Sequence, residues 1–425
     1  MMANLRPSRV EQSNGQTVVV GFDFGTHSTK AVYGLRTSEE RRMFDFCERA
    51  QGYSSFVAPS LVRLDQANQL WFGGHALKQK EGILFESLKV RLLGLDAEAW
   101  QPTFPKGYSP DMLVAAYLAW AFQKVRAFLQ SEYSNPRVLL NMSAPMDRLE
   151  SPKVKVRFLQ VAHAAWEMTW GSSPITVEQG TPYAALETRL RGLLEEKTPD
   201  ETVRRFDVVP ETVAAMLSLA LDARYDPRMH MIVDIGAGTT EISINHLNEP
   251  DPTRQNTRVL CYADTTLPLG ANRFAAAAAT EVPGASESTE DLLAQILKEC
   301  QKVWFTGYLK DCASHATRPR WRILRLLLAG GGARRSEISM CIHDNKPHEM
   351  CFSTESSYDV LWHQPNIKML RSGSDKRDLP LLTVAHGLSI ERVKWPTLFR
   401  PHEIEDLAPT TQIEKGDPFS HIGGR

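Results

Sequence analysis

The chain has 425 residues, of which 42% are hydrophobic and 23% are charged, and its formal net charge is -1. A chain of this length can bury more than one hydrophobic core and is expected to form about two domains. The near-neutral charge excludes an overall field that would attract nucleic acid or an anionic membrane. We therefore expect no direct nucleic-acid partner and no membrane association.

Cysteine usage and the N-terminal segment predict a cytoplasmic protein. The six cysteines form no Cys-x-x-Cys pair, which fits a reducing compartment. Residues 1–16 are polar and lack the apolar stretch of a secretory signal. The most apolar long stretch, residues 112–129, contains Lys124 and Arg126, which favour an amphipathic helix packed in a domain over a membrane span.

A strand, a turn and a returning strand are predicted at two places in the chain. The apolar run at 18–22 stops at Asp23, and a strand resumes at 31–33. Later, residues 231–233 run into Asp234, and residues 242–244 alternate as a returning strand should. Two similar hairpins predict a duplicated lobe.

Helices and a third strand are predicted around these hairpins. The apolar run at 323–329 ends in Gly330, Gly331 and Gly332, where the backbone can approach a ligand closely. Strands that alternate with helices indicate α/β architecture, and residues from about Pro396 onward are expected to form a loosely attached tail. The expected helices run from Asp111 to Leu129, from Glu211 to Leu221, from Asp291 toward Trp304, and over residues 274–279.

Several conspicuous side chains have a simple structural explanation. Trp120, Trp166 and Trp170 fall at helical spacings that are typical of core positions. Cys261 and Cys300 are expected to be buried small hydrophobic residues, because no histidine lies near them in the sequence.

The two hairpin turns predict a clamp for a phosphate chain. Backbone amides in glycine-rich turns can hold phosphates, and carboxylates can position a hydrated magnesium ion. A strand followed by Asp-x-Gly is also common in ordinary turns, so each hairpin alone is weak support. The first turn (residues 25–28) supplies Gly25, Thr26, His27 and Ser28 after Asp23, and the second turn (residues 236–239) supplies Gly236, Ala237, Gly238 and Thr239 after Asp234.

These segments resemble the motifs of the superfamily that contains actin, heat-shock chaperones and sugar kinases. Residues 21–26 resemble its first phosphate motif, residues 234–240 its second, and residues 328–334 its adenosine motif. Residues 209–215 and 383–387 look like its two connecting helices. The resemblance implies a two-lobed actin-like ATPase fold: two ribonuclease-H-like α/β lobes with ATP in the central cleft.

Segments after the first hairpin narrow the resemblance to the nucleotide-binding domain of DnaK-type heat-shock proteins. They are residues 58–62, 72–76 and 88–94. On this resemblance we expect lobe I at 17–210, lobe II at 211–395, with its last helix returning to lobe I, and a tail at 396–425. No peptide-binding domain is expected after residue 393.

The resemblance also implies roles for individual residues. Asp23 and Asp234 would face Mg²⁺ through its waters, Thr26 and Thr239 would contact phosphate, and Glu211 would order the metal or the attacking water. The other implied nucleotide-binding residues are Gly25, His27, Ser28, Gly236, Ala237, Gly238, Gly270, Gly330, Gly331, Gly332 and Arg334, with Glu299 and Lys302 as the ribose-binding pair and Arg334 along the adenine.

Three departures from the family pattern affect the predicted site. Lys89 stands one position too early relative to Arg91, so it is either the catalytic lysine, brought in by a bulge, or a solvated surface charge. Ala237 replaces a glycine and requires a negative φ. Leu381 and Leu382 stand where the chaperones carry an acidic residue, so hydrolysis could be slow.

The leading hypothesis is an ATPase that hydrolyses ATP to ADP and phosphate and acts as a conformational switch on an unidentified partner protein. The chain is expected to be a monomer or a weak oligomer. Alternatives are a filament-forming actin-like ATPase of the MreB or ParM type, a binder that holds ATP without hydrolysis, and a small-molecule kinase, for which no sugar-binding carboxylate is recognisable.

Overall fold

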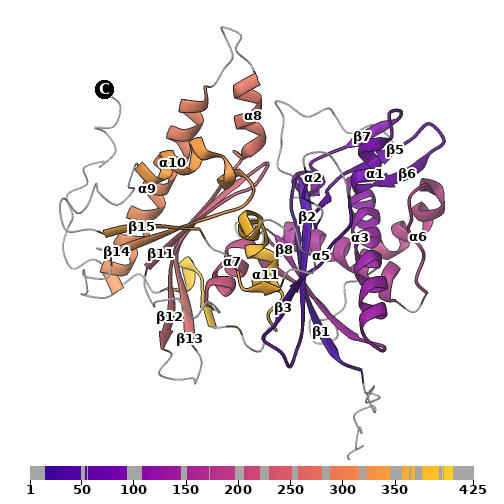
Figure 1. The fold of residues 1–425 in the computed structure, drawn as a ribbon, viewed down its shortest axis with the longest axis horizontal. Coiled ribbons are helices and arrows are strands. Elements are labelled where there is room, and N and C mark those ends of the chain that lie inside the picture. The colour runs from indigo at the N-terminus through magenta and orange to yellow at the C-terminus, as the bar shows by residue number, and fades with distance from the viewer. Residues whose placement is uncertain are drawn as a thin grey trace, which may run out of the picture.

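The computed structural model describes residues 15–48, 53–54, 56–92, 108–144, 151–171, 173–196, 205–220, 229–250, 257–279, 288–314, 321, 323–344, 357–362, 365–368, 376–391, 395 and 397–404. Within these residues the chain has a mixed α/β fold, and its strands form three sheets. Figure 1 shows the two larger sheets in different halves of the molecule, each with helices packed against it.

The first sheet contains the first predicted hairpin. Its strands are β1 (Thr17–Phe24), β2 (Ser28–Leu35), β3 (Arg41–Met43), β4 (Ala58–Pro59), β8 (Arg137–Ala144), β10 (Phe206–Pro210) and β16 (Ile367–Lys368). Their order is β10-β8-β1-β2-β3-β16, and β4 also pairs with β2. All of β1 after Thr17 is buried, as its continuous apolar run predicts for a central strand.

The second sheet contains the second predicted hairpin. Its strands are β11 (Met229–Ile235), β12 (Thr240–Pro250), β13 (Thr257–Leu267), β14 (Ile323–Ala329), β15 (Ser357–Trp362) and β17 (Thr397–Phe399). Their order is β15-β14-β11-β12-β13-β17. Both predicted hairpins and the predicted third strand are confirmed.

The two sheets have the same strand order and the same strand directions. In each, the first hairpin strand pairs antiparallel with the second and parallel with a later strand, β8 in one sheet and β14 in the other. The outer strands repeat this agreement, because β16 lies parallel to β3 and β17 lies parallel to β13. The two hairpin turns therefore occupy equivalent positions in two equivalent sheets.

A small third sheet follows the first hairpin. Its strands are β5 (Val62–Leu64), β6 (Gln69–Phe72), β7 (Ile83–Phe85) and β9 (Thr181–Pro182), in the order β7-β5-β6-β9. Two short helices belong to this part of the chain, α1 (Gly73–Lys78) and α2 (Leu88–Leu92).

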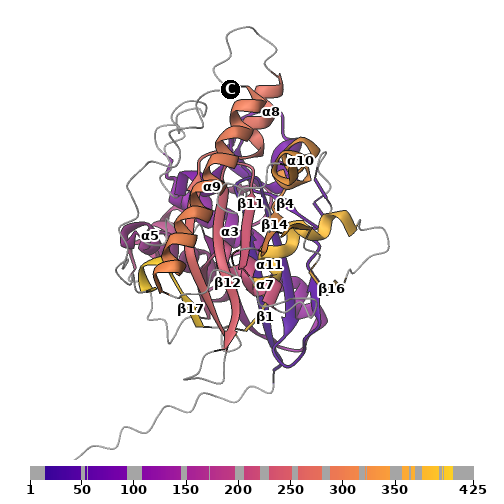
Figure 2. The same ribbon diagram turned by 90° about the vertical axis from the view of Figure 1, so that its left-hand side faces the viewer.

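The longer helices pack beside the sheets. The half of the molecule with the first sheet contains α3 (Pro110–Glu132), α5 (Pro152–Trp170) and α6 (Tyr183–Glu195). The half with the second sheet contains α8 (Ala271–Ala279), α9 (Thr289–Ser314) and α10 (Ser336–Asp344). Figures 1 and 2 show α9 along one face of the second sheet, where it contacts β12 and β13. Short 3₁₀ turns are η2 (Gly332–Arg334), η3 (Lys376–Leu382) and η5 (Pro401–Glu403).

Two helices, α7 (Glu211–Ala220) and α11 (Thr383–Leu388), lie together between the two larger sheets (Figure 1). Their backbones touch closely, since a Cβ at Gly387 would lie 1.7 Å from the carbonyl oxygen of Ala214. Although α11 comes late in the chain, it packs on β1 and β2 of the first sheet, and Asn141 Nδ2 on β8 donates to Leu388 O at 2.7 Å. The two halves of the chain are thus joined through this helix pair.

The apolar helix α3 is a core helix. Among the described residues it is the one helix long and apolar enough to cross a membrane, but 72% of its most apolar window is buried inside the protein. Residues 112–122 are buried on every side, so this stretch is less amphipathic than we predicted. Trp120 and Trp166 are buried and Trp170 packs against the same core, as expected.

Other sequence predictions differ from the structure in detail. The N-cap of α3 is Ser109, and Asp111 lies in the first turn, where it pairs with Arg157 at 2.5 Å. The helix predicted to begin at Asp291 is α9, which begins two residues earlier, at Thr289. Part of the predicted tail, β17, is an edge strand of the second sheet, because its backbone pairs with β13. Residues 405–425 lie outside the described part of the chain.

Candidate functional site

The two hairpins present matching residue positions at their turns. On β1 and β2, Asp23 stands directly opposite Lys30, and on β11 and β12, Asp234 stands directly opposite Glu241. Side chains at opposite positions of an antiparallel pair lie on the same face of the sheet. Each turn therefore carries an acidic residue before it and a charged residue after it, positive in the first hairpin and negative in the second.

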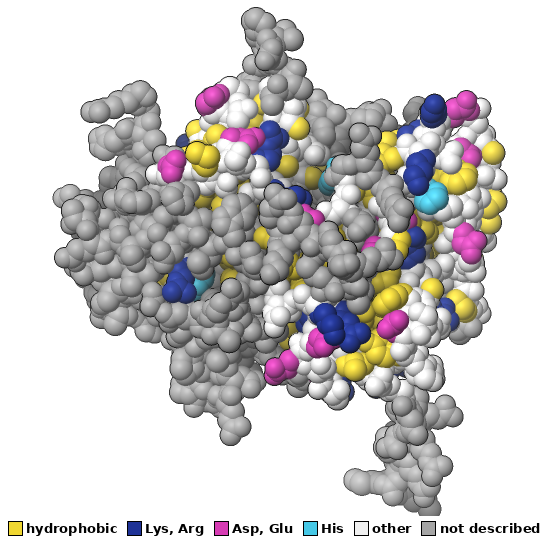
Figure 3. Space-filling model, viewed as in Figure 1, with side chains coloured by type: hydrophobic (Ala, Val, Ile, Leu, Met, Phe, Trp, Pro, Cys, Tyr) yellow, Lys and Arg dark blue, Asp and Glu magenta, His cyan; other side chains and the backbone are white. Residues whose placement is uncertain are grey.

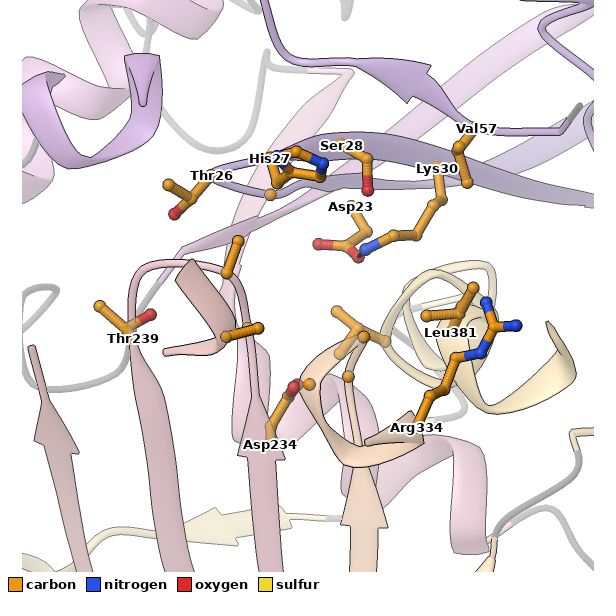
Figure 4. A pocket seen from close by; sticks show the side chains of 18 of the residues that line it. Asp23, Thr26, His27, Ser28, Lys30, Val57, Asp234, Thr239, Arg334 and Leu381 are labelled. Atoms are coloured by element: carbon orange, nitrogen blue, oxygen red, sulfur yellow. Dashed lines mark hydrogen bonds and ion pairs between the residues drawn. The ribbon is translucent and has the colours of Figure 1, made fainter. Parts of the chain in front are cut away.

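Both turns open onto one cavity of about 400 Å³, within the range that holds small-molecule ligands, roughly 300–1,000 Å³. In Figure 4 the side chains of Asp23 and Asp234 face this space from opposite sides. The predicted site residues that line it are Asp23, Gly25, Thr26, His27, Ser28, Lys89, Glu211, Asp234, Gly236, Ala237, Thr239, Gly330, Gly331, Gly332 and Arg334.

Asp23 is buried and held by two donors. Ser143 Oγ donates to Oδ1 at 2.9 Å, and Lys30 Nζ lies 2.8 Å from Oδ2. Burial alone would raise the pKa of Asp23, but the positive charges of Lys30 and Lys89 and the Ser143 hydroxyl outweigh it and lower that pKa. Asp23 is therefore a fixed, ionised carboxylate.

Asp234 has the opposite electrostatic balance. Burial and the nearby negative charge of Asp23 raise the pKa of Asp234 to about 6. The backbone of Gly330 presses against it: with φ at +78°, a Cβ at Gly330 would lie 2.3 Å from Asp234 Oδ1. Only glycine fits here, because the conformation and the contact both exclude a side chain.

Lys89 points into the cavity from α2 and is 4% exposed, so it is not a solvated surface charge. It forms an ion pair with Glu211, the first residue of α7. Burial lowers the pKa of Lys89, and the carboxylates of Asp23, Glu241 and Asp234 oppose this shift. The short helix that carries Lys89 follows Ser87, whose φ of +54° is uncommon for a residue other than glycine.

The two turns come into contact beside the cavity. A Cβ at Gly238 would lie 3.1 Å from Thr26 Cγ2, so Gly238 packs against the first turn although it does not line the cavity. Gly270 packs on the second turn, where a Cβ would lie 2.5 Å from Ala237 O. The φ of Ala237 is not positive, as its replacement of a glycine requires.

Arg334 and Leu381 lie on the far side of the cavity from Thr26 and Thr239 (Figure 4). The guanidinium of Arg334 makes a 2.9 Å ion pair with Asp378. The hydroxyl of Ser54 also donates to Asp378, at 2.9 Å. Leu381 lines the cavity wall and lies against Gly331.

His27 lies at the rim of the cavity. Its ring stacks on Tyr53, with centroids 4.8 Å apart, and it is largely exposed. Although the residue as a whole is exposed, partial desolvation of its ring and the charge of Lys30 lower the pKa of His27. Both effects disfavour a positive charge on the imidazole.

The predicted ribose-binding pair is not among the residues that line the cavity. Glu299 and Lys302 pair with each other on α9 at 3.3 Å, and the Lys302 side chain is 61% exposed. Cys261 and Cys300 are buried as predicted, and burial raises the pKa of Cys300 to about 12, which disfavours the thiolate form.

Several charged or polar residues of the site were missed from the sequence, among them Lys30, Glu241, Ser143 and Asp378. Lys30 and Glu241 could have been found, because each stands seven positions after the aspartate of its hairpin, where antiparallel register brings the two together. Ser143 and Asp378 carry no such signal, because β8 and η3 reach the site only through the tertiary fold.

The charged side chains elsewhere are mixed in sign. On the described part of the face in Figure 3, Lys and Arg side chains lie among Asp and Glu side chains.

Neither a scan of protein-family models nor a search of curated proteins finds a match to this sequence.

Proposed function

We propose that the chain is an ATP-binding and ATP-hydrolysing protein of the actin-like fold, closest to the nucleotide-binding half of DnaK-type chaperones. One observation carries the proposal: two hairpin turns, at equivalent positions of two sheets with the same topology, meet at one cavity with Asp23 and Asp234 on opposite sides. A duplicated pair of α/β lobes around a central ligand accounts for this arrangement.

The cavity suits a ligand that carries a dense negative charge. Its two turns offer backbone N–H groups, and Lys30 and Lys89 add two ammonium groups that are at present paired with carboxylates. A triphosphate would take over these donors. The Thr26 and Thr239 hydroxyls lie on the two turns and would contact phosphate oxygens.

The residues also fit a hydrated Mg²⁺ ion. Two carboxylates from different sheets face the same space, and the charge of Asp23 helps to raise the pKa of Asp234; a divalent cation between them would remove that repulsion. No cluster of three potential metal-ligating side chains occurs in the described chain, so water and phosphate oxygens would complete the shell, as Mg²⁺ prefers. When bound, the ion would offset phosphate charge.

Hydrolysis needs little covalent chemistry from the protein. The oxygen of a water molecule attacks the γ-phosphorus in line, the bond to the β,γ-bridging oxygen breaks, and ADP and phosphate leave. Glu211 would order the attacking water, and Lys89, its ion-pair partner, would offset the charge that spreads over the transferred group. Asp23, which is already ionised, would contact the metal ion through its water ligands.

Nucleotide binding between the two halves would change how the halves are arranged relative to each other. α7 and α11 join the halves, and Glu211 opens α7 directly at the cavity. Closure around ATP and opening after hydrolysis would present two surfaces to an unidentified partner protein.

The test is a measurement of ATP affinity by calorimetry together with phosphate release at saturating ATP and Mg²⁺. We expect binding and slow release in the wild type, and release at background in the Asp23→Ala and Asp234→Ala variants. Binding without release above that background would show a non-hydrolysing binder, and the absence of ATP binding would refute the proposal. Light scattering with and without ATP, run on the same samples, reports filament formation.

A further inference from the structure

Arg334 is held by a buried carboxylate. Asp378, on η3 just before α11, is 9% exposed, and its Oδ1 lies 2.9 Å from Arg334 Nη1. Its other oxygen, Oδ2, accepts a hydrogen bond of 2.9 Å from Ser54 Oγ. Both carboxylate oxygens thus have a partner, and the partners come from distant parts of the chain.

These partners belong to different halves of the molecule. Arg334 ends η2, which follows β14 of the second sheet, while Ser54 precedes β4 of the first sheet. Arg334, Ser54 and Leu381 all line the cavity. Asp378 therefore ties together two walls of the cavity through Arg334 and Ser54. Arg334 lies at the end of the cavity away from Thr26 and Thr239 (Figure 4).

We infer that Asp378 is a positioning residue for nucleotide binding: it holds the Arg334 guanidinium in place as a wall for the base and ties that wall to the first half through Ser54. The inference rests on the proposed ATP-binding function. The chaperone resemblance leads us to expect an acidic residue where this chain has Leu381 and Leu382. Asp378, three residues before Leu381 on η3, supplies a carboxylate at this end of the site instead.

The physical reason is preorganisation. A free arginine side chain loses much rotamer freedom when a ligand packs on it, and that loss weakens binding. An arginine already fixed by a carboxylate has lost this freedom before the ligand arrives. The planar guanidinium can then stack on an aromatic base while its edge stays in the ion pair with Asp378.

The experiment compares wild type with Asp378→Asn, Arg334→Ala and the double variant. Asp378→Asn keeps the size of the side chain and removes its charge, so we expect the Kd for ATP to rise about tenfold, because the ion pair that holds Arg334 is lost. KM should rise in proportion and kcat should stay unchanged, because the γ-phosphate end of the cavity is intact. Asp378→Glu should recover part of the affinity.

The double variant tests whether Asp378 acts through Arg334. If it does, Asp378→Asn has no further effect on Kd once Arg334 is alanine. Glu187→Gln is the matched control, because it removes a carboxylate from an exposed ion pair with Arg191 on α6 and should leave Kd unchanged. Ser54→Ala, a milder change that keeps the ion pair, should raise Kd about twofold to threefold.

The outcomes separate this inference from the proposed function. A wild-type protein that does not bind ATP refutes both. A wild type that binds ATP, with folded Asp378→Asn and Ser54→Ala proteins of unchanged affinity, refutes only the role of Asp378. Additive effects of Asp378→Asn and Arg334→Ala on the binding free energy also overturn it. If Asp378→Asn does not fold, Ser54→Ala alone decides between these results.

Discussion

Lys89, a buried lysine on α2, forms an ion pair with Glu211, the first residue of α7. The pair links the part of the chain around the third sheet to the helix that joins the two halves. It also shows that the one-residue offset of Lys89 from the chaperone pattern does not turn this lysine away from the cavity.

Replacement of Lys89 should separate binding from hydrolysis. In the Lys89→Ala variant we expect phosphate release to fall by about a hundredfold, because the proposed site would lose one positive charge that offsets the charge of the transferred phosphoryl group. The Kd for ATP should change less. Lys302→Ala removes an exposed lysine outside the cavity and serves as the control; hydrolysis at the wild-type rate in Lys89→Ala would contradict the assignment.

The two site aspartates should respond oppositely to the same substitution. The pKa of Asp234 is raised to about 6, so its contribution to stability is present at low pH and is lost as pH rises through about 6. The pKa of Asp23 is lowered, so its contribution is present above the unfolded value and is lost as pH falls through the lower folded value.

At pH 7 in the absence of nucleotide and metal, Asp234→Asn should therefore stabilise the protein, by about 1 kcal/mol, and Asp23→Asn should destabilise it by about 2 kcal/mol. Urea unfolding at about pH 5 and pH 7.5 measures both effects. The gain from Asp234→Asn should shrink at the lower pH, where the wild-type carboxyl is protonated. The same sign of change for both variants at pH 7 would contradict these electrostatics.

Gly330 should not tolerate alanine. A Cβ there would collide with Asp234 Oδ1 at 2.3 Å, and the φ of +78° adds backbone strain. We expect Gly330→Ala to lower the free energy of unfolding by about 2 kcal/mol and to abolish nucleotide binding. Gly192→Ala on the exposed face of α6 is the control: nothing lies within 4 Å, and it should stabilise the protein by about 0.5–1 kcal/mol.

Lys302 should contribute little to nucleotide affinity. Its ammonium is exposed and paired with Glu299 on the same helix, and neither residue lines the cavity. We expect Lys302→Ala to change the Kd for ATP by less than about twofold, since exposed pairs of this kind contribute little. A tenfold loss of affinity would instead support the ribose-binding role that the chaperone resemblance implies.

Local patterns in the sequence were enough to predict both hairpins, the third strand and the buried tryptophans. Such features depend on neighbouring residues, because strand periodicity and turn chemistry act over a few positions. The aspartates at the ends of β1 and β11 could also be predicted, since each ends an apolar run. The antiparallel register of β1 and β2 also places Lys30 directly opposite Asp23, a pairing that our sequence prediction did not include.

The tertiary structure alone decided which distant residues meet. Ser143 reaches Asp23 because β8 lies parallel to β1, and Asp378 reaches Arg334 because η3 packs beside the cavity. Residues 397–399 resemble a tail in composition, yet their backbone completes the edge of the second sheet. Side-chain chemistry near each turn is local and can be read from the chain, whereas the partners of a buried charge depend on how separate elements pack.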